Sequence, residues 1–143
     1  MAPIFDCPIS NGTFVMTSIL LADHHSLFRA GMVKLIDAIG GFTLAAEVDT
    51  ARAAVDYVAE YTPDILLLEM GMPDMSGFEV LRRIQRMHLG TRVVALTNWT
   101  TQPMPLHAMR AGIDGYLGKE LTRRNSRKRC TKYALADDTS RKP

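Results

Sequence analysis

Five polar residues of the kinds used in phosphoryl chemistry stand directly after short apolar runs of the chain. Asp23 and His24 follow the first run, and Glu69 follows the third. Thr97 and Lys119 follow the fourth and the fifth. In phosphoryl sites a lysine neutralises phosphate oxygens, a hydroxyl group hydrogen-bonds one of them, and carboxylates hold a divalent metal ion. This order of residue types therefore indicates a phosphoryl site, provided that the fold brings the ends of the runs together.

The apolar runs are short enough to be strands, and segments of helical period lie between them. The runs span residues 19–22, 42–48, 65–68, 93–96 and 115–117. Between them, apolar residues recur at three- and four-residue spacing, as expected for helices with one buried face. Capping signals support these boundaries, with Asp49 and Thr50 before the second helix and a capping box from Ser76 to Glu79 before the third. Glycines at 40–41, 90 and 112 stand where the helices are expected to end.

Strands that are apolar throughout, rather than alternating, are typical of a parallel sheet buried on both faces. The sequence therefore predicts an open α/β fold, in which helices cover a parallel sheet. In such folds the functional site lies at the carboxyl ends of the strands. That is where the five polar residues stand.

The composition limits the class of protein. The chain has 143 residues, of which 47% are hydrophobic and 22% charged, as expected for one folded domain. No apolar run reaches the roughly 18 residues of a membrane span, and the first residues lack the pattern of a secretory signal. Cys7 and Cys130 lie far apart and form no metal-binding spacing, which fits the reducing cytosol. We expect a cytoplasmic protein with no membrane partner.

Charge divides the chain into a body and a tail. Residues 1–120 hold nine Lys and Arg against thirteen Asp and Glu, whereas residues 121–143 hold eight against two. We expect an N-terminal extension over 1–16, with Met16 as a possible natural start. The domain is expected over 17–120, followed by a basic tail over 121–143. The tail has room for a partial fifth helix at most and is too short for a helix-turn-helix, so we expect no specific DNA binding by this chain alone.

Four motifs in order resemble a known family. Residues 20–31, 63–77, 94–97 and 111–119 resemble the response-regulator receiver domain of the NarL/LuxR type. This resemblance implies a two-component (phosphorelay) signalling protein of a class that includes transcription regulators. It also implies a flavodoxin-like (CheY-like), doubly wound, five-stranded parallel sheet in the order 2-1-3-4-5.

The resemblance assigns roles to single residues. Asp23 matches the first metal-binding acid, and Gly71 would offer a backbone carbonyl to magnesium. Thr97 matches the switch hydroxyl and Tyr116 the switch aromatic. Lys119 matches the lysine that contacts the phosphoryl group.

Two positions depart from the family pattern, and both concern the same chemistry. His24 stands where a second metal-binding acid is expected, and imidazole is a poor ligand for magnesium. Glu69 stands where the phosphoacceptor aspartate is expected, and its extra methylene displaces the nucleophilic oxygen by roughly 1 Å, which can cost on the order of 10²-fold in rate. We therefore expect a weakened magnesium site at best and no stoichiometric phosphorylation. Either Glu69 pairs with Lys119, so that the pocket is satisfied without phosphate or metal, or it points to solvent.

Other residues near the site allow further interpretations. Asp74 is the nearest alternative phosphoacceptor, but an ordinary loop acid near the next helix is the preferred interpretation. His24 and His25 beside Glu69 also suggest a transition-metal site, which is disfavoured because adjacent residues on a loop rarely point the same way. Trp99, after the fourth strand, is either a partner contact or a lid over the pocket.

Two functions of different class remain. The first is an atypical receiver that is not an enzyme and acts mainly through protein–protein contacts, with a histidine kinase or another signalling protein as partner. The second is a working, phosphoryl-accepting receiver of a LuxR-type transcriptional regulator. We also expect a homodimer, because five of the seven residues at 123–129 are Lys or Arg and cannot cover the apolar side of the first helix.

Overall fold

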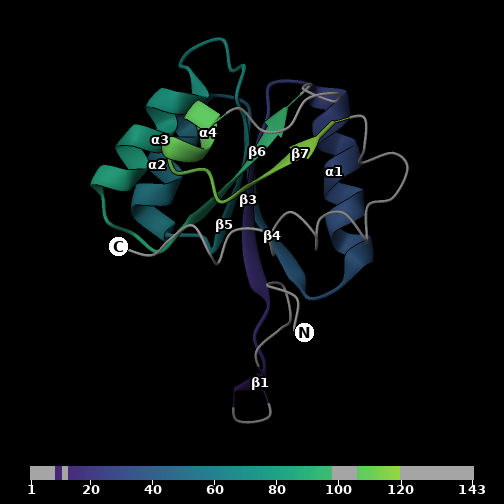
Figure 1. The fold of residues 1–143 in the computed structure, drawn as a ribbon. Coiled ribbons are helices and arrows are strands. Elements are labelled where there is room, and N and C mark those ends of the chain that lie inside the picture. Colours follow the sequence, from purple (N-terminus) through teal and green to yellow (C-terminus); the bar gives the residue numbers. More distant parts are fainter. Residues whose placement is uncertain (1–8, 11–12, 98–105, 120–143) are drawn as a thin grey trace.

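The computed structural model describes residues 9–10, 13–97 and 106–119 and shows a sheet with helices on both sides (Figure 1). Seven strands and four helices occur in these residues. In chain order they are β1 (Ile9–Ser10), β2 (Thr13–Phe14), β3 (Thr17–Ala22), α1 (Ser26–Ile39), β4 (Phe42–Val48), α2 (Ala51–Tyr61), β5 (Ile65–Glu69), α3 (Gly77–Arg86), β6 (Arg92–Thr97), α4 (Leu106–Arg110) and β7 (Gly115–Gly118).

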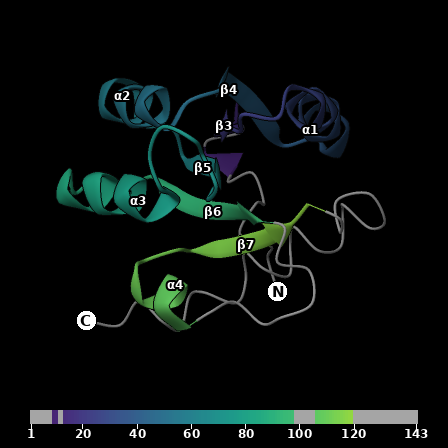
Figure 2. The same ribbon diagram turned by 90° about the horizontal axis from the view of Figure 1, so that it is seen from above.

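Five strands form one parallel sheet in the order β4-β3-β5-β6-β7, with β5 at the centre. Counted from β3, this is the order 2-1-3-4-5, so the predicted flavodoxin-like, CheY-like fold is confirmed. Figure 2 shows the strands side by side in this order, seen from above. The carboxyl ends of all five strands therefore meet at one edge of the sheet.

The side chains of each central strand alternate between two cores. Leu20 and Ala22 of β3 face a core shared with α2 and α3, whereas Ile19 and Leu21 face the core under α1. Figure 1 shows α1 on one side of the sheet and α2, α3 and α4 on the other. Every residue of β5 is buried, as its continuous apolar run predicts.

β4 departs from the expectation that each strand is buried on both faces. Its residues alternate between half-buried and exposed along the whole strand. β4 lies at the edge of the sheet, so only one of its neighbours is a strand. Its half-buried residues contact both cores: Phe42 and Leu44 pack against the core under α1, whereas Ala46 and Val48 pack against the core on the side of α2 and α3.

The hydroxyl caps predicted at two helix starts are confirmed, although the Glu79 carboxylate pairs with Arg83 at 3.0 Å, and one predicted helix stop is wrong. The Thr50 hydroxyl accepts a hydrogen bond from the Ala53 N–H at 3.1 Å at the start of α2. The Ser76 hydroxyl accepts one from the Glu79 N–H at 3.4 Å at the start of α3. Gly90 does not end α3: the helix ends at Arg86, and the left-handed conformation after it belongs to His88, with φ of 52°.

The ends of the chain lie mostly outside the described residues. Within the extension expected over 1–16, β1 and β2 form a short antiparallel pair below the main sheet in Figure 1. The predictions for Cys7, Trp99, Cys130 and the tail 121–143 fall outside the described residues. Among the helices that the structure describes, none has the length and apolar character needed to cross a bilayer.

Candidate functional site

Three of the predicted site residues meet at the carboxyl edge of the sheet. Asp23 follows β3, Glu69 ends β5 and Lys119 follows β7. The Lys119 ammonium lies 2.7 Å from Asp23 Oδ2 and forms a second ion pair with Glu69 Oε2. All three side chains are almost fully enclosed, with exposed fractions of 9% for Lys119, 0% for Asp23 and 6% for Glu69. Two buried negative charges therefore share one buried positive charge.

The backbone of β7 fixes where this lysine starts. The Lys119 N–H donates to the Thr97 carbonyl at 2.9 Å, which continues the pairing of β7 with β6 past the last strand residue. From there the side chain reaches across the end of β6 to the ends of β5 and β3. The length of the lysine side chain is what allows a residue of the edge strand to contact acids on two inner strands.

Glu69 uses both of its carboxylate oxygens within the protein. Oε1 accepts a hydrogen bond from the Gly71 N–H at 2.9 Å, and Oε2 pairs with Lys119. A Cβ at position 71 would lie 3.1 Å from Oε1, so the glycine lets the carboxylate fold back onto the loop. The pairing of Glu69 with Lys119 is one of the two arrangements expected from the sequence. The Gly71 carbonyl as a metal ligand stays a prediction.

Asp23 is the organising acid of the loop after β3. Its Oδ1 accepts the His25 N–H at 2.7 Å and lies 3.0 Å from His25 Nδ1. Its own carbonyl accepts a hydrogen bond from the Arg29 guanidinium at 2.7 Å, and that guanidinium also pairs with Glu47 on β4. The sequence analysis assigned no role to Arg29. A basic residue in the first turn of the helix that follows Asp23 is a signal by which this contact with the loop could have been found.

The two histidines converge, contrary to the expectation that adjacent loop residues point apart. The rings of His24 and His25 lie 3.8 Å apart between centroids, and each offers a ligand atom within 4.8 Å of the other and of the Asp23 carboxylate. The hydrogen bond from the His25 N–H back to Asp23 bends the chain and explains the convergence. Nδ1 of His24 is buried and has no hydrogen-bond partner among the described residues.

His25 is the residue just before α1, but its ring does not cap the helix. It provides no side-chain cap bond, and its Nδ1 lies 2.9 Å from the Lys119 ammonium. The Phe28 ring lies 4.6 Å from the same ammonium, at cation–π distance. Lys119 is thus surrounded by two carboxylates, one imidazole and one aromatic ring. Sequence reasoning assigned Phe28 only to the apolar face of the first helix.

The two predicted switch residues stand on the neighbouring strands. Thr97 ends β6 and is buried, and Tyr116 in β7 is half-buried against the core on the side of α2 and α3. Their movement on activation stays a prediction.

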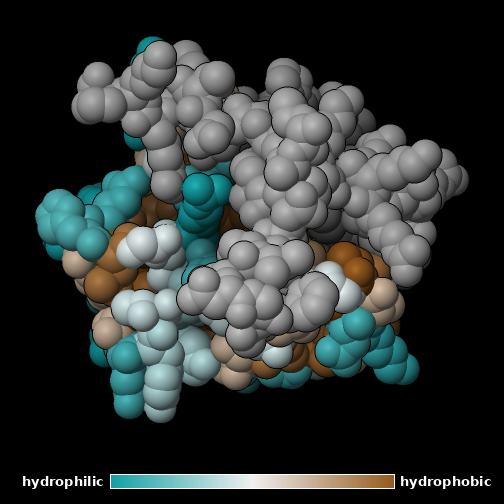
Figure 3. Space-filling model, turned by 90° about the horizontal axis from the view of Figure 1, so that it is seen from below, coloured by the Kyte–Doolittle hydropathy of each residue, from teal (hydrophilic) through white to brown (hydrophobic). Residues whose placement is uncertain are grey.

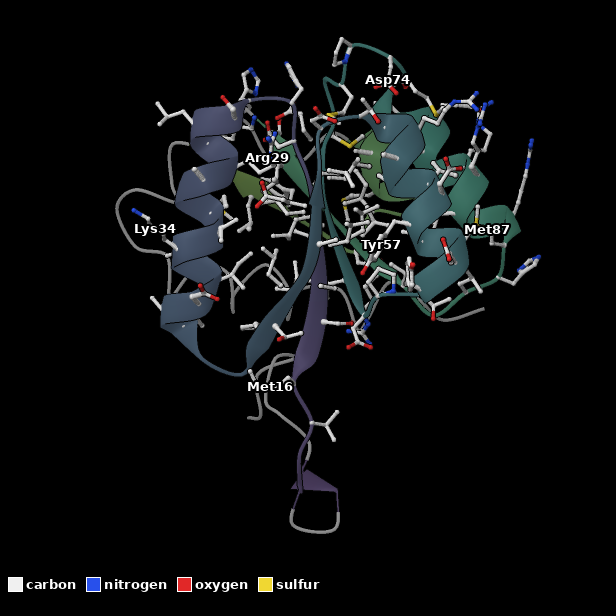
Figure 4. All side chains as sticks on the ribbon, turned by 180° about the vertical axis from the view of Figure 1, so that it is seen from behind. Met16, Arg29, Lys34, Tyr57, Asp74 and Met87 are labelled. Atoms are coloured by element: carbon white, nitrogen blue, oxygen red, sulfur yellow. The ribbon has the colours of Figure 1, made fainter. Side chains whose placement is uncertain are left out.

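Asp74 has a structural partner. Its carboxylate accepts hydrogen bonds from the backbone N–H groups of Ala51 and Arg52 at 2.9 and 3.0 Å, so it caps the start of α2. Burial alone would raise the pKa of Asp74, but these and neighbouring backbone N–H groups lower it below its ordinary value. Figure 4 shows Asp74 and Arg29 toward the same end of the molecule, with Met16 at the opposite end.

Asp23, Glu69 and Lys119 gather at the carboxyl end of the sheet. Figure 3 shows the molecule from below the view of Figure 1, and on this face hydrophilic and hydrophobic residues are mixed. A cleft of about 380 Å³ lies between α3 and the loop before β7, bordered by Leu81, Gln85, Gly112 and Asp114. The Asp114 carboxylate accepts the Val93 N–H at 2.7 Å, so this acid holds β6 in place.

Known proteins match both the sequence and the fold. Residues 19–131 match the family model described as the response regulator receiver domain. The response regulator UvrY of Escherichia coli K12 is 35% identical over 104 residues, which are 73% of this chain and 48% of UvrY. The response regulator GacA of Pseudomonas syringae pv. syringae is 31% identical over 104 residues, 73% of this chain and 49% of GacA. The chain thus spans about half the length of the curated relatives it matches.

Solved structures agree. The signal receiver domain of a NarL response regulator from Mycobacterium tuberculosis superposes with a TM-score of 0.73 and 28% identity, over 84% of this chain and 97% of that one. A DNA-binding response regulator of the LuxR family from Staphylococcus aureus gives a TM-score of 0.66 and 33% identity, over 73% of this chain and 88% of that one. The family match over residues 19–131 includes Asp23, Glu69 and Lys119.

Proposed function

Because this chain belongs to the response regulator receiver family, we propose that it is an atypical receiver domain of a two-component system that acts mainly through protein–protein contacts. The observation that carries the proposal is the state of Glu69. One carboxylate oxygen binds the Gly71 N–H and the other pairs with the Lys119 ammonium. A carboxylate held on both oxygens, at the position where the family has its phosphoacceptor, is a poor nucleophile toward a phosphoryl donor.

Magnesium is the ion that the family implies, and the donors at this site fit it poorly. Mg²⁺ demands near-octahedral oxygen ligands. Here the Asp23 and Glu69 carboxylates already face one ammonium, and an imidazole stands where the resemblance implies a second carboxylate. A divalent cation would have to displace Lys119 or share its ligands against charge repulsion. We therefore propose that magnesium binding is weakened relative to other receivers.

Intact mass spectrometry after incubation with acetyl phosphate and magnesium tests this proposal. The unmodified protein is expected to gain no stoichiometric phosphate under conditions that label ordinary receivers. The double variant Glu69→Asp with His24→Asp restores both acids and is expected to recover labelling and magnesium binding. Glu69→Asp alone is the matched control, because it restores the acceptor without the metal ligand.

The alternative is a working, phosphoryl-accepting receiver of a LuxR-type transcriptional regulator. Asp23, Thr97 and Lys119 are all present at the strand ends, which is the observation in its favour. In that case Thr97 and Tyr116 would act as the switch residues. A gain of one phosphate by the unmodified protein would establish this alternative and refute the preferred function.

The partners follow from the proposed class. We propose a non-enzymatic signalling module of the cytosol whose partner is a histidine kinase or another signalling protein. Specific DNA recognition by this chain alone is not part of the proposal.

We further propose that the chain forms a homodimer through the surface near its fourth and fifth helical positions. The core under α1 is strongly apolar and includes Met32, Ile36 and Leu117. The basic residues at 123–129 are poor candidates to cover more of this apolar surface. Burying an unpaired charge costs more than the roughly 1.5–3 kcal/mol gained by burying an apolar side chain. Sedimentation at micromolar concentration is expected to show the dimer, and a highly stable monomer would contradict this expectation.

A further inference from the structure

The loop after β3 carries three metal-ligand side chains in consecutive positions. Asp23, His24 and His25 each offer one ligand atom, and these atoms all lie within 4.8 Å of one another. In a tetrahedral zinc site with bonds near 2.0–2.1 Å, ligand atoms are separated by about 3.3 Å. The observed donors thus need to close by about 1.5 Å at most, a displacement that side-chain rotation supplies.

The hydrogen bonding of the loop leaves one of these donors available. Nδ1 of His24 is buried without a hydrogen-bond partner among the described residues, and a buried ring nitrogen in that state is costly unless something binds it. Asp23, by contrast, is held by the His25 N–H, which fixes the carboxylate beside both rings. The loop therefore presents a fixed oxygen donor and two imidazole rings, with ligand atoms within 4.8 Å of one another.

The donor types select the class of ion. One carboxylate with two imidazoles is rich in nitrogen, and imidazole suits zinc, nickel, copper and iron, whereas magnesium and calcium prefer oxygen. His24 thus weakens magnesium binding but adds a ligand suited to a metal ion of borderline softness, such as zinc.

Lys119 competes for the same atoms. Its ammonium lies 2.7 Å from Asp23 Oδ2 and 2.9 Å from His25 Nδ1, so it contacts two of the three donors. It also pairs with Glu69, which provides a place for the ammonium when the other two donors turn away from it. A metal ion at Asp23 and His25 and the present position of Lys119 are therefore mutually exclusive arrangements of one pocket.

We propose that Asp23, His24 and His25 form a binding site for a borderline divalent metal ion such as zinc, which competes with the Lys119 ammonium for Asp23 and His25. This site does not depend on whether Glu69 accepts a phosphoryl group. Metal binding would release Lys119 from Asp23 and leave it paired with Glu69, so the ion would alter the contacts between the ends of β3 and β7.

Isothermal titration of the full chain with zinc chloride tests the proposal, in a background with Cys7→Ser and Cys130→Ser so that no thiol binds the metal. One zinc ion per chain is expected, with magnesium chloride binding more weakly than zinc. His24→Gln is expected to lower zinc affinity about tenfold or more, as the loss of a ligand costs at least as much as the loss of an outer-shell partner. Lys119→Met is expected to raise it about tenfold or more, because the competing charge is gone.

Two further variants make the result specific. His88→Asn removes an exposed histidine at the end of α3, at a positive φ that asparagine tolerates, and is expected to leave zinc affinity unchanged. His24→Asp keeps a ligand but exchanges nitrogen for oxygen, so it is expected to shift the zinc-to-magnesium affinity ratio about tenfold or more toward magnesium. If His24→Gln fails to fold, His24→Asp still tests whether His24 is a zinc ligand.

Four results would overturn the proposal. They are no zinc binding by the Cys-free chain, tighter binding of magnesium than of zinc, equal zinc affinity in His24→Gln, and unchanged affinity in Lys119→Met. None of them bears on the phosphorylation test, which uses acetyl phosphate and mass. The failure of one proposal is therefore distinguishable from the failure of the other.

Discussion

Replacing Lys119 by methionine removes the one ammonium that lies between the Asp23 and Glu69 carboxylates. Methionine keeps most of the volume, and its thioether suits the Phe28 ring that the ammonium now faces at 4.6 Å, so the change mainly removes the charge. Both carboxylates are buried, with exposed fractions of 0% and 6%, and water cannot replace the lost partner without opening the pocket. Two like charges then face each other across the site.

The expected loss is large for a domain of this size. Removing one partner of a buried ion pair costs about 3–5 kcal/mol, because the remaining charge is left uncompensated. A domain usually has only about 5–15 kcal/mol of stability in total. The corresponding fall in melting temperature is on the order of 10–20 °C. An exposed ion pair would instead contribute about 0–1 kcal/mol, so the two cases are easy to separate.

Urea denaturation followed by circular dichroism at neutral pH measures this loss. Lys34→Met is the matched control, because Lys34 is exposed on α1 and its side chain is seen on the outside of the helix in Figure 4. That control is expected to stay within about 0.5 kcal/mol of the parent. A Lys119→Met protein within about 1 kcal/mol of the parent would refute the argument that Lys119 neutralises two buried acids.

Glu69→Gln, made with and without Lys119→Met, tests whether Glu69 and Lys119 are energetically coupled. In the parent, Glu69→Gln removes one partner of Lys119 and is expected to destabilise the protein. In the Lys119→Met background the same change removes one of two uncompensated charges and is expected to stabilise it. The reversal is the non-additivity of a double-mutant cycle, of about 0.5–3 kcal/mol for residues in contact. Equal effects of Glu69→Gln in both backgrounds would show that the pair is not coupled.

Two other substitutions test the elements that build the site. Asp74→Ala is expected to cost about 1 kcal/mol through loss of the α2 cap. Burial alone would raise the pKa of Asp74, but backbone hydrogen bonds lower it below 3.8, so its contribution is complete above that value and is lost as the pH falls through the lower folded pKa. The difference in urea midpoint between parent and variant should therefore shrink in acid, and a constant difference would contradict the cap. Gly77→Ala would place a Cβ 2.6 Å from Met70 Sδ and 2.8 Å from Met70 Cα, so it should lower the free energy of unfolding by about 1–3 kcal/mol. Gly31→Ala is the control, because the space around its Cβ is open, and it should not destabilise the protein in the same denaturation experiment.

The fold was predictable because its strands are specified by local sequence. The run at 65–68 predicts a strand buried on both faces, and β5 occupies the centre of the sheet with every residue buried. Thr50 and Ser76 cap their helices as their positions suggest. The stop of α3 was predicted wrongly because glycine is the usual residue in the left-handed conformation, and here His88 adopts it instead, with Gly90 two residues later.

The arrangement of the site was predictable only as far as strand order determines it. Parallel strands place Asp23, Glu69 and Lys119 at one edge, and the pairing of Glu69 with Lys119 was one of two arrangements left open by the sequence. The convergence of His24 and His25 was not predictable in this way, since it depends on one hydrogen bond within the loop rather than on any periodic pattern.

That single hydrogen bond connects the two proposals for this chain. By folding the loop back, it brings the His25 ring to 3.0 Å from the Asp23 carboxylate and 2.9 Å from the Lys119 ammonium. An acid in place of His24 would favour magnesium in the same loop, and Lys119 would then meet a phosphoryl group instead of two carboxylates. With imidazole at that position and a glutamate long enough to reach Lys119, the ammonium becomes the resident cation of the pocket. A metal ion displaces the ammonium only if its bonds to the two imidazoles are stronger than the ion pair between Lys119 and Asp23. Lys119→Met removes the ion pair, and His24→Asp removes one of the nitrogen ligands.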